Sequence, residues 1–137
     1  SSAASDVYKR QGYGSDVEVF KNAFLHIEGN GATNINATII CGEHIHLCDR
    51  VMLGRDITIR DNNGNHYIAM RGYKDTRPVF IGQHAWLCEG AIIMPGVKIG
   101  DGAIIGAKSF VTQNVSAYSM VSGNPAQVIE EDVYWKY

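Results

Sequence analysis

From residue 81 onward, the chain repeats a six-residue pattern without a gap. Each block opens with an aliphatic residue, and the openers are Ile81, Leu87, Ile93, Ile99, Ile105 and Val111. Two residues before each opener stands a small or β-branched residue, namely Val79, Ala85, Ala91, Val97, Ala103 and Ser109. A period of six matches neither a helix nor a plain alternating strand, so it indicates a short strand and a turn, repeated. Such a repeat is typical of an all-β solenoid of the β-helix type.

The same period extends upstream, where the openers are expected to be Cys41, Leu47, Leu53 and Ile59. Because residues two apart in a strand share a face, each opener and the residue two positions earlier should point into the core. Three blocks predict one triangular coil of about 18 residues, with Gly, Asp and Asn in the turns.

One polar segment, residues 60–78, interrupts the period between Ile59 and Ile81. It predicts a loop that leaves the solenoid. Long loops on rigid scaffolds are more often functional than merely connecting.

These patterns define three parts of the chain. We place the β-helix domain at residues 17–130 and a disordered or non-native extension at residues 1–16. Residues 131–137 form a short C-terminal tail that we expect to pack across the last coil, because the end of a solenoid exposes apolar residues and needs a cap.

Composition argues against several kinds of partner. The 137 residues carry a formal net charge of −2 without a basic stripe, so nucleic acid is not expected to bind. No apolar run reaches the roughly 18 residues that span a bilayer, and no secretory leader is recognisable. The 3 cysteines are too few for a disulfide scaffold. We therefore expect a cytoplasmic protein without membrane insertion.

Some outward positions are apolar, which favours oligomerisation. One coil apart, Trp86 should lie beside Ile104, and Ile92 beside Phe110. Adjacent exposed apolar rows indicate buried contacts with other subunits, whereas scattered single residues would not.

Three strings carry a resemblance to a known family: IGQHAWLCEG, PGVKIGDGAIIGA and SGNPAQVI. Over about residues 35–130 the chain resembles the hexapeptide-repeat acyltransferases, and it is most similar to the short sugar and polysaccharide O-acetyltransferases. Galactoside, maltose and serine acetyltransferases are similar as well. The resemblance implies a left-handed parallel β-helix, a homotrimer, acetyl-CoA bound between subunits, and acetyl transfer to a hydroxyl of a sugar or polysaccharide precursor.

The resemblance also implies the site residues. His66, in the interrupting loop, matches the family's general base, and imidazole has a pKa suited to deprotonating a hydroxyl near neutral pH. Asp61 and Asn63 are implied acceptor contacts, although Asp61 could instead fix the tautomer of His66. Backbone N–H groups around Cys88 and Glu89 are implied donors to the oxyanion. The implied acetyl-CoA contacts are Trp86, Cys88, Glu89, Ala107, Lys108, Thr112 and Gln113.

Four positions depart from the family pattern and keep a second function open. Glu89 replaces a residue that is often small, and Gln113, Gln127 and Glu130 stand where basic residues are common. These changes remove expected partners of the CoA phosphates. The alternative is a catalytically silent hexapeptide trimer that serves as a binding or scaffold module.

Metal chemistry is the third alternative. His44 and His46 could share a face, but zinc sites need three or four ligands. The γ-type carbonic anhydrases use a similar fold with three histidines, two of them four residues apart, and no such pair occurs here. We therefore expect no metal, a structural role for His84 in its turn, and Cys41 as a small core residue.

Overall fold

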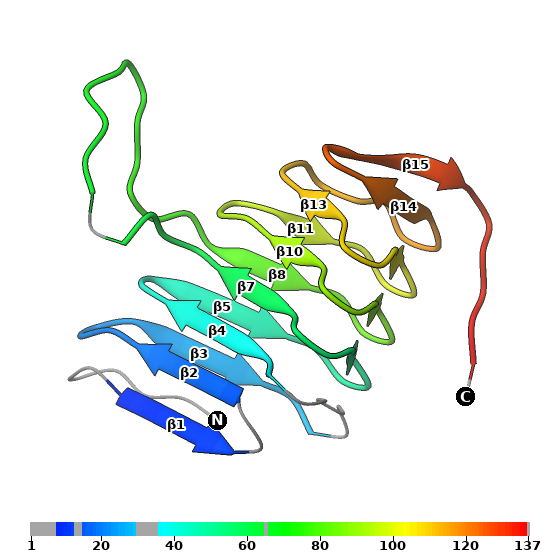
Figure 1. Ribbon diagram of the computed structural model, residues 1–137, viewed down its shortest axis with the longest axis horizontal. Coiled ribbons are helices and arrows are strands. Elements are labelled where there is room, and N and C mark those ends of the chain that lie inside the picture. The colour runs from blue at the N-terminus through cyan, green and yellow to red at the C-terminus, as the bar shows by residue number, and fades with distance from the viewer. Residues whose placement is uncertain (1–7, 13–14, 30–35, 65, 137) are drawn as a thin grey trace.

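The computed structural model describes residues 8–12, 15–29, 36–64 and 66–136, and every regular element in these ranges is a strand. The strands stack in three sheets wound around one core (Figure 1). No helix that could cross a bilayer occurs among the described residues. The predicted left-handed parallel β-helix is confirmed.

The three sheets take one strand from each coil in turn. Sheet A contains β1 (Tyr8–Gly12), β2 (Ser15–Val19), β4 (Thr38–Cys41), β7 (Thr58–Arg60), β10 (Ile92–Ile93) and β13 (Phe110–Val111). Sheet B contains β3 (Phe24–Ile27), β5 (His44–Leu47), β8 (Val79–Ile81) and β11 (Lys98–Ile99). Sheet C contains β6 (Met52–Leu53), β9 (Trp86–Leu87), β12 (Ile104–Ile105), β14 (Met120–Gly123) and β15 (Ala126–Glu130). Successive coils pair in parallel, and the pairs at the two ends, β1 with β2 and β14 with β15, are antiparallel.

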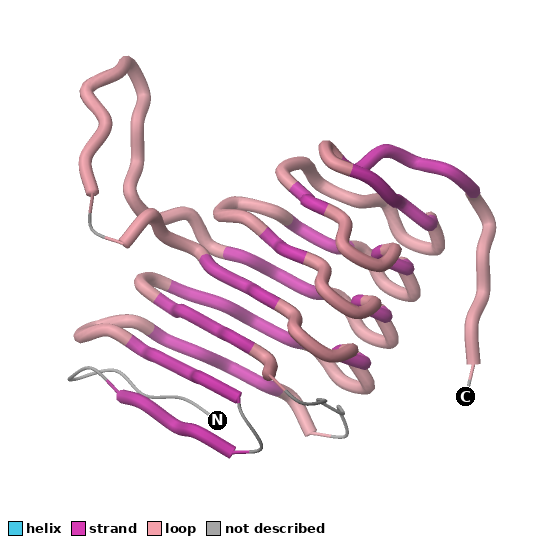
Figure 2. Tube along the Cα trace, in the orientation of Figure 1, coloured by secondary structure: helices cyan, strands magenta, loops and turns pink. Residues whose placement is uncertain are grey.

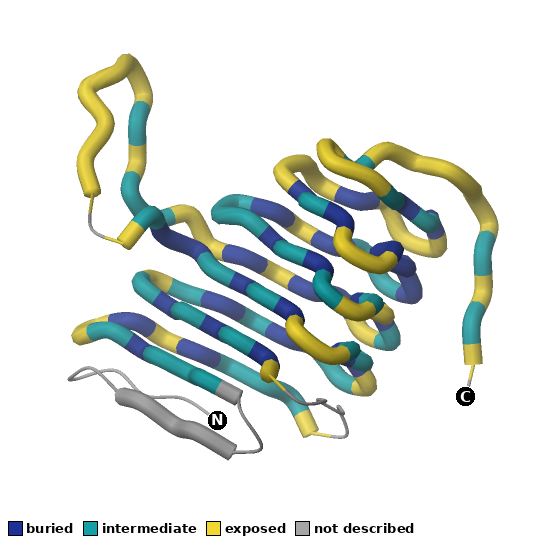
Figure 3. The backbone as a smooth tube through the Cα atoms, viewed as in Figure 1, coloured by how far each residue is buried: buried dark blue, intermediate teal, exposed yellow. Residues whose placement is uncertain are grey.

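The core lies inside the coils and consists of the residues that the six-residue period selects. Ile81, Leu87, Ile93, Ile99 and Ile105 are completely buried. Buried and more exposed positions alternate along each coil (Figure 3). Full burial of one such side chain contributes about 1.5–3 kcal/mol, so the stacked openers dominate the free energy of folding.

The coil before the loop is longer than the period predicts. Ile39, and not Cys41, pairs with Ile59, whereas downstream Ile93 pairs with Val111. The expected opener at Cys41 is therefore wrong by two residues, although its side chain is buried as expected. The additional residues widen the turn around Gly42 that joins β4 to β5.

Asp61 closes this wider turn. Its buried carboxylate accepts hydrogen bonds from the backbone N–H groups of Gly42 (2.6 Å), Glu43 (2.9 Å) and His44 (2.7 Å). These donors lie outside the regular ladder, and a buried donor without a partner costs about 1–3 kcal/mol. One carboxylate thus fixes both the turn and the residue at which the loop begins.

The predicted loop leaves the solenoid between β7 and β8, as Figures 1 and 2 show. Its base is closed by an antiparallel bridge between Asn62 and Thr76, and Arg77 N–H donates to the Asp61 carbonyl at 2.8 Å. Asn62 is buried and donates from Nδ2 to the carbonyl of Ile40 at 3.1 Å. The loop is therefore anchored to the coil beneath it.

The C-terminal segment runs back along the solenoid after the β14–β15 hairpin (Figure 1). Val133 N–H donates to the Tyr118 carbonyl at 2.9 Å, and Trp135 stacks on His84 with ring centroids 4.0 Å apart. The sequence analysis expected the tail to pack across the last coil. The tail also reaches an earlier coil, where it contacts His84.

The N-terminal region differs from the expectation of disorder over Tyr8–Gly12. These residues form strand β1, which pairs with β2 in antiparallel register. Residues 1–7 and 13–14 lie outside the described residues, and the proposed boundary at residue 17 falls inside β2.

We predict that Gly54→Ala destabilises the fold. A Cβ at this position would lie 2.8 Å from the backbone nitrogen of Glu89 in the next coil, and the backbone cannot yield as a flexible side chain can. Overpacking of this kind costs about 1–3 kcal/mol. Urea denaturation should report the loss. Gly29→Ala, where no atom lies within 4 Å, is the control and should change stability by less than about 1 kcal/mol. Equal effects of both substitutions would contradict this explanation.

We also predict that Asp61→Asn destabilises the chain by about 2–3 kcal/mol, because the amide would turn a donor toward backbone donors. Urea denaturation measures the change. Asp56→Asn, at an exposed turn position, is the control. An Asp61→Asn variant as stable as the control would show that the carboxylate does not hold the turn.

Candidate functional site

His66 lies near the start of the extruded loop, and its backbone is fixed by a neighbouring tyrosine. The hydroxyl of Tyr73 donates to the His66 carbonyl oxygen at 2.7 Å, and Nδ2 of Asn63 donates to the same hydroxyl at 3.0 Å. The ring of Tyr67 meets Tyr73 edge-on at 5.5 Å. The His66 side chain is exposed, so the loop presents its imidazole to solvent while holding its main chain.

The structure separates the two predicted acceptor contacts. Asp61 is completely buried and binds backbone N–H groups, so it is not available to a sugar and does not contact the His66 ring. Asn63 is half-buried and belongs to the network around Tyr73. The sequence analysis missed Tyr73, whose contact with His66 appears only in the folded loop.

A polar pocket opens at the base of the loop. Its volume is about 260 Å³, and its lining consists of Glu43, Lys74, Thr76, Arg77 and Pro78. The Thr76 hydroxyl donates to the Glu43 carboxylate at 2.6 Å, which joins the loop base to the wide turn of the preceding coil. Hydroxyl and charged groups of this kind suit a hydrophilic ligand.

Most of the predicted acetyl-CoA residues gather at one corner of the solenoid. The turn after β9 stacks on the turn after β12, because Cys88 N–H donates to the Ile105 carbonyl at 2.8 Å and Lys108 N–H donates to the Glu89 carbonyl at 2.8 Å. Ala107 and Lys108 are exposed at this corner. The Cys88 N–H is taken by the ladder, so the expected oxyanion donor at Cys88 is wrong.

Trp86 lies on the outer face of sheet C beside this corner. It is 37% exposed, and Trp135 of the tail packs against it with ring centroids 5.5 Å apart. Ile104, its in-register neighbour, is only 7% exposed, so the predicted exposed row is wrong at that position. The other predicted row, Ile92 and Phe110, is in register as expected and partly exposed.

His84 is held by the same tail. Its Nε2 lies 2.8 Å from the Trp135 carbonyl oxygen, and Trp135 Nε1 donates to the His84 carbonyl oxygen at 2.8 Å. The parallel ring stack covers one face of the imidazole. These contacts agree with the structural role expected for His84.

Thr112 and Gln113 lie at a different corner. They follow β13, whereas Cys88 and Glu89 precede β10, and these two strands pair in parallel. The loop with His66 follows β7 in the same sheet, so it shares the corner of Thr112. Within one chain, the His66 corner lies at the carboxyl ends of the strands of sheet A, and the Lys108 corner lies at their amino ends.

The cysteines are unsuited to nucleophilic chemistry at neutral pH. Burial is the main cause that raises the pKa of Cys41 to about 12 and of Cys48 to about 11, with negative charge on Asp61 and Glu28, respectively, adding to it. Burial also raises the pKa of Cys88. All three thiols are free of disulfides.

The chain is similar to hexapeptide-repeat transferases. Residues 78–113 match the family described as bacterial transferase hexapeptide (six repeats). The galactoside O-acetyltransferase of Escherichia coli strain K12 is 31% identical over 109 residues, which are 78% of this chain and 54% of that protein. The chloramphenicol acetyltransferase of Agrobacterium fabrum strain C58 is 44% identical over 63 residues, 46% of this chain and 30% of that protein.

Solved structures agree with these sequence matches. A galactoside acetyltransferase in complex with coenzyme A has a TM-score of 0.65 at 30% identity, covering 79% of this chain and 55% of the other. A maltose O-acetyltransferase from Clostridium difficile 630 has a TM-score of 0.70 at 32% identity, covering 78% and 58%. The chain spans about half the length, or less, of the curated relatives that it matches. The repeat that matches the bacterial transferase hexapeptide family, residues 78–113, forms coils of the observed solenoid.

Proposed function

We propose that the protein is an acetyltransferase that moves an acetyl group from acetyl-CoA to a hydroxyl of a sugar or polysaccharide precursor. The observation that carries this proposal is the exposed His66, whose backbone is fixed at the start of a loop anchored to the solenoid. The similarity to galactoside and maltose O-acetyltransferases supports the reaction class. We place the reaction in the cytoplasm, where acetyl-CoA is available.

His66 acts as the general base in this proposal. Its imidazole accepts the proton of the acceptor hydroxyl as that oxygen attacks the thioester carbonyl carbon. The carbon–sulfur bond then breaks, and the imidazolium returns the proton to the leaving CoA thiolate. A base with a pKa near the working pH suits both transfers. Tyr73 and Asn63 act as positioning residues, because they hold the main chain of His66.

The corner formed by the turns after β9 and β12 is the proposed donor site. Lys108 is exposed there and carries the point charge that a CoA phosphate requires. Trp86, Cys88, Glu89 and Ala107 flank the path of the donor, and the Glu89 N–H is the remaining proposed oxyanion donor. Thr112 and Gln113 are proposed contacts for the far end of the donor.

The acceptor site is proposed at the base of the loop. The pocket beside Glu43, Thr76 and Arg77 supplies carboxylate, hydroxyl and guanidinium groups, which form hydrogen bonds with sugar hydroxyls. The side chain of Asn63 is a further proposed contact of the acceptor. This pocket lies at the corner from which the His66 loop departs.

A site that needs both corners is completed by a second copy of the chain. In one chain, His66 and Lys108 lie at opposite ends of the parallel strands of sheet A. The His66 corner of one subunit must therefore meet the Lys108 corner of its neighbour. The partly exposed row of Ile92 and Phe110 lies between these corners and is the proposed contact surface. A cyclic trimer repeats this heterologous contact and closes.

We predict that His66→Ala lowers kcat by about 10²- to 10⁴-fold, the usual contribution of a general base. Acetyl-CoA affinity, measured by calorimetry, should stay unchanged in this variant.

Lys108→Ala should do the reverse: it weakens acetyl-CoA binding and reduces the salt dependence of that binding. His84→Ala is the histidine control. It should lower the melting temperature and leave kcat nearly unchanged, because His84 holds the tail.

Three outcomes would count against this assignment. Full activity in His66→Ala together with a loss in His84→Ala would move the base to the turn. Unchanged affinity in Lys108→Ala would reassign the phosphate contact. No binding of acetyl-CoA by the wild-type chain would favour a silent binding or scaffold trimer, for which Glu89, Gln113, Gln127 and Glu130 are the sequence arguments.

We further predict that light scattering gives three times the chain mass of 15.0 kDa. At a low acetyl-CoA concentration, His66→Ala chains mixed with Lys108→Ala chains should regain activity after subunit exchange, because some mixed sites hold both intact residues. A stable monomer, or a mixture that stays inactive while exchange is verified, would contradict a site shared between subunits.

A further inference from the structure

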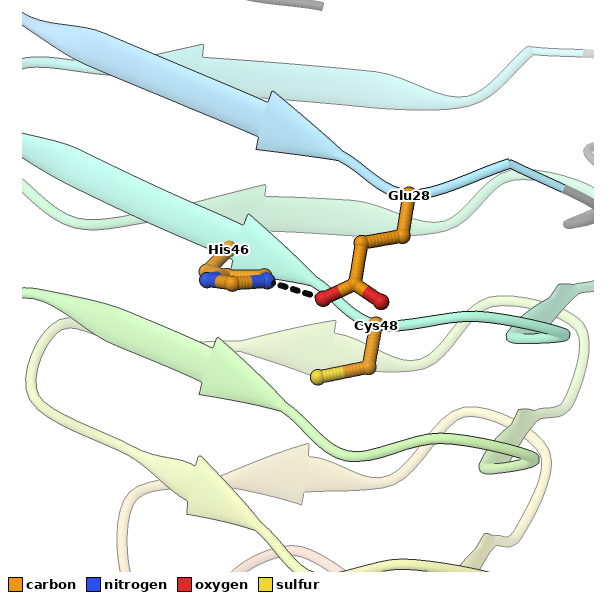
Figure 4. A group of neighbouring side chains, drawn as sticks. All are labelled: Glu28, His46 and Cys48. Atoms are coloured by element: carbon orange, nitrogen blue, oxygen red, sulfur yellow. Dashed lines mark hydrogen bonds and ion pairs between the residues drawn. The ribbon is translucent and has the colours of Figure 1, made fainter.

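A second group of chemically reactive side chains lies on sheet B, in the coils that precede the His66 loop. Glu28 follows β3, His46 lies on β5, and Cys48 follows β5 (Figure 4). Strands β3 and β5 pair in parallel with Ile27 opposite Leu47, and Glu28 N–H donates to the Leu47 carbonyl at 2.9 Å. The register thus brings Glu28 and Cys48 side by side, with His46 on the same face.

The three ligand atoms converge. Nε2 of His46 and Oε2 of Glu28 are 2.6 Å apart, and one ligand atom from each of the three residues lies within 4.8 Å of the other two. Among the described residues this is the one group of three such side chains with converging ligand atoms. The Glu28 carboxylate pairs with His46 and accepts a hydrogen bond from the Cys48 thiol, so all three side chains face one another.

The His46 ring is held in place by its neighbours. It stacks on His26 with centroids 4.5 Å apart, and Phe80 meets its other side edge-on at 5.2 Å. Its side chain is 23% exposed and that of Glu28 is 38% exposed, so an ion can reach the group from solvent. An imidazole that its neighbours hold in place, with both other ligand atoms already close to it, needs little rearrangement to bind a cation.

We propose that Glu28, His46 and Cys48 bind a zinc-class divalent cation. Imidazole nitrogen, thiolate sulfur and carboxylate oxygen are the ligands that zinc takes in proteins, and three protein ligands leave the fourth tetrahedral position for water. The ion would join the end of β3 to β5 and so fasten two successive coils near the N-terminal end of the solenoid. The spacing of His44 and His46 gave no such site, because two of the three ligands come from outside that pair.

The test uses the full chain without a polyhistidine tag, freed of metal by a chelator and dialysed. Zinc titration by calorimetry should give one ion per chain. Cobalt(II), as a spectroscopic substitute, should give a near-ultraviolet thiolate-to-cobalt band and the intense visible bands of a four-coordinate ion. Zinc should raise the melting temperature, and the increase should grow with the logarithm of the free zinc concentration above the dissociation constant, because zinc binds the folded state.

Variants identify the ligands. Cys48→Ser should remove the thiolate band and weaken zinc binding by more than about tenfold, and Glu28→Gln should weaken it without removing the band. Cys88→Ser is the matched control for a half-buried thiol and should bind as the wild type does. Absence of zinc and cobalt binding in the wild type would overturn the proposal. So would a cobalt spectrum without a thiolate band, or binding unchanged in both Cys48→Ser and Glu28→Gln.

Discussion

The backbone ladder between successive coils is the constraint on which the rest of the structure depends. Cys88 N–H donates to Ile105, Gly106 N–H donates to Val121, and Gly54 N–H donates to Leu87, each at 2.8 Å. These bonds align equivalent positions of neighbouring coils, so a side chain at one corner recurs above its counterpart in the next coil. The same ladder leaves little space between turns, since a Cβ on Gly54 would lie only 2.8 Å from the backbone nitrogen of Glu89.

Where the ladder is interrupted, a side chain takes its place. The turn between β4 and β5 is wider than the period allows, and its N–H groups bind the carboxylate of Asp61 instead of a neighbouring carbonyl. The loop with His66 starts at this residue. A resemblance to a family assigns Asp61 to the substrate, but a fully buried carboxylate with three short backbone donors is part of the fold. The loop base and the wide turn are thus one unit, and the polar pocket lies between them.

The parallel ladder also places the proposed base and the proposed donor contacts at opposite ends of the strands of sheet A. Because β7, β10 and β13 run in the same direction, their ends collect His66 and Thr112 at one corner, and their beginnings collect Glu89 and Lys108 at the other. Within one chain, the proposed base His66 and the proposed donor contacts Glu89 and Lys108 lie at different corners. This arrangement is the physical reason for proposing that subunits share a site, and it is stronger than the apolar rows, since Ile104 is already covered within its own chain.

The sequence by itself determined the solenoid, its core and the position of the loop, because a strict six-residue period admits one arrangement of strands and turns. It also singled out His66, since only one segment leaves that period. The tertiary structure alone decided what depends on side chains from different coils: the burial of Asp61, the Tyr73 hydroxyl on the His66 carbonyl, and the tail on His84. It also decided the convergence of Glu28, His46 and Cys48. A six-residue period does not encode which side chains of different segments meet. In the coils before the loop even the register departs from the downstream period, since Ile39 and not Cys41 is the partner of Ile59.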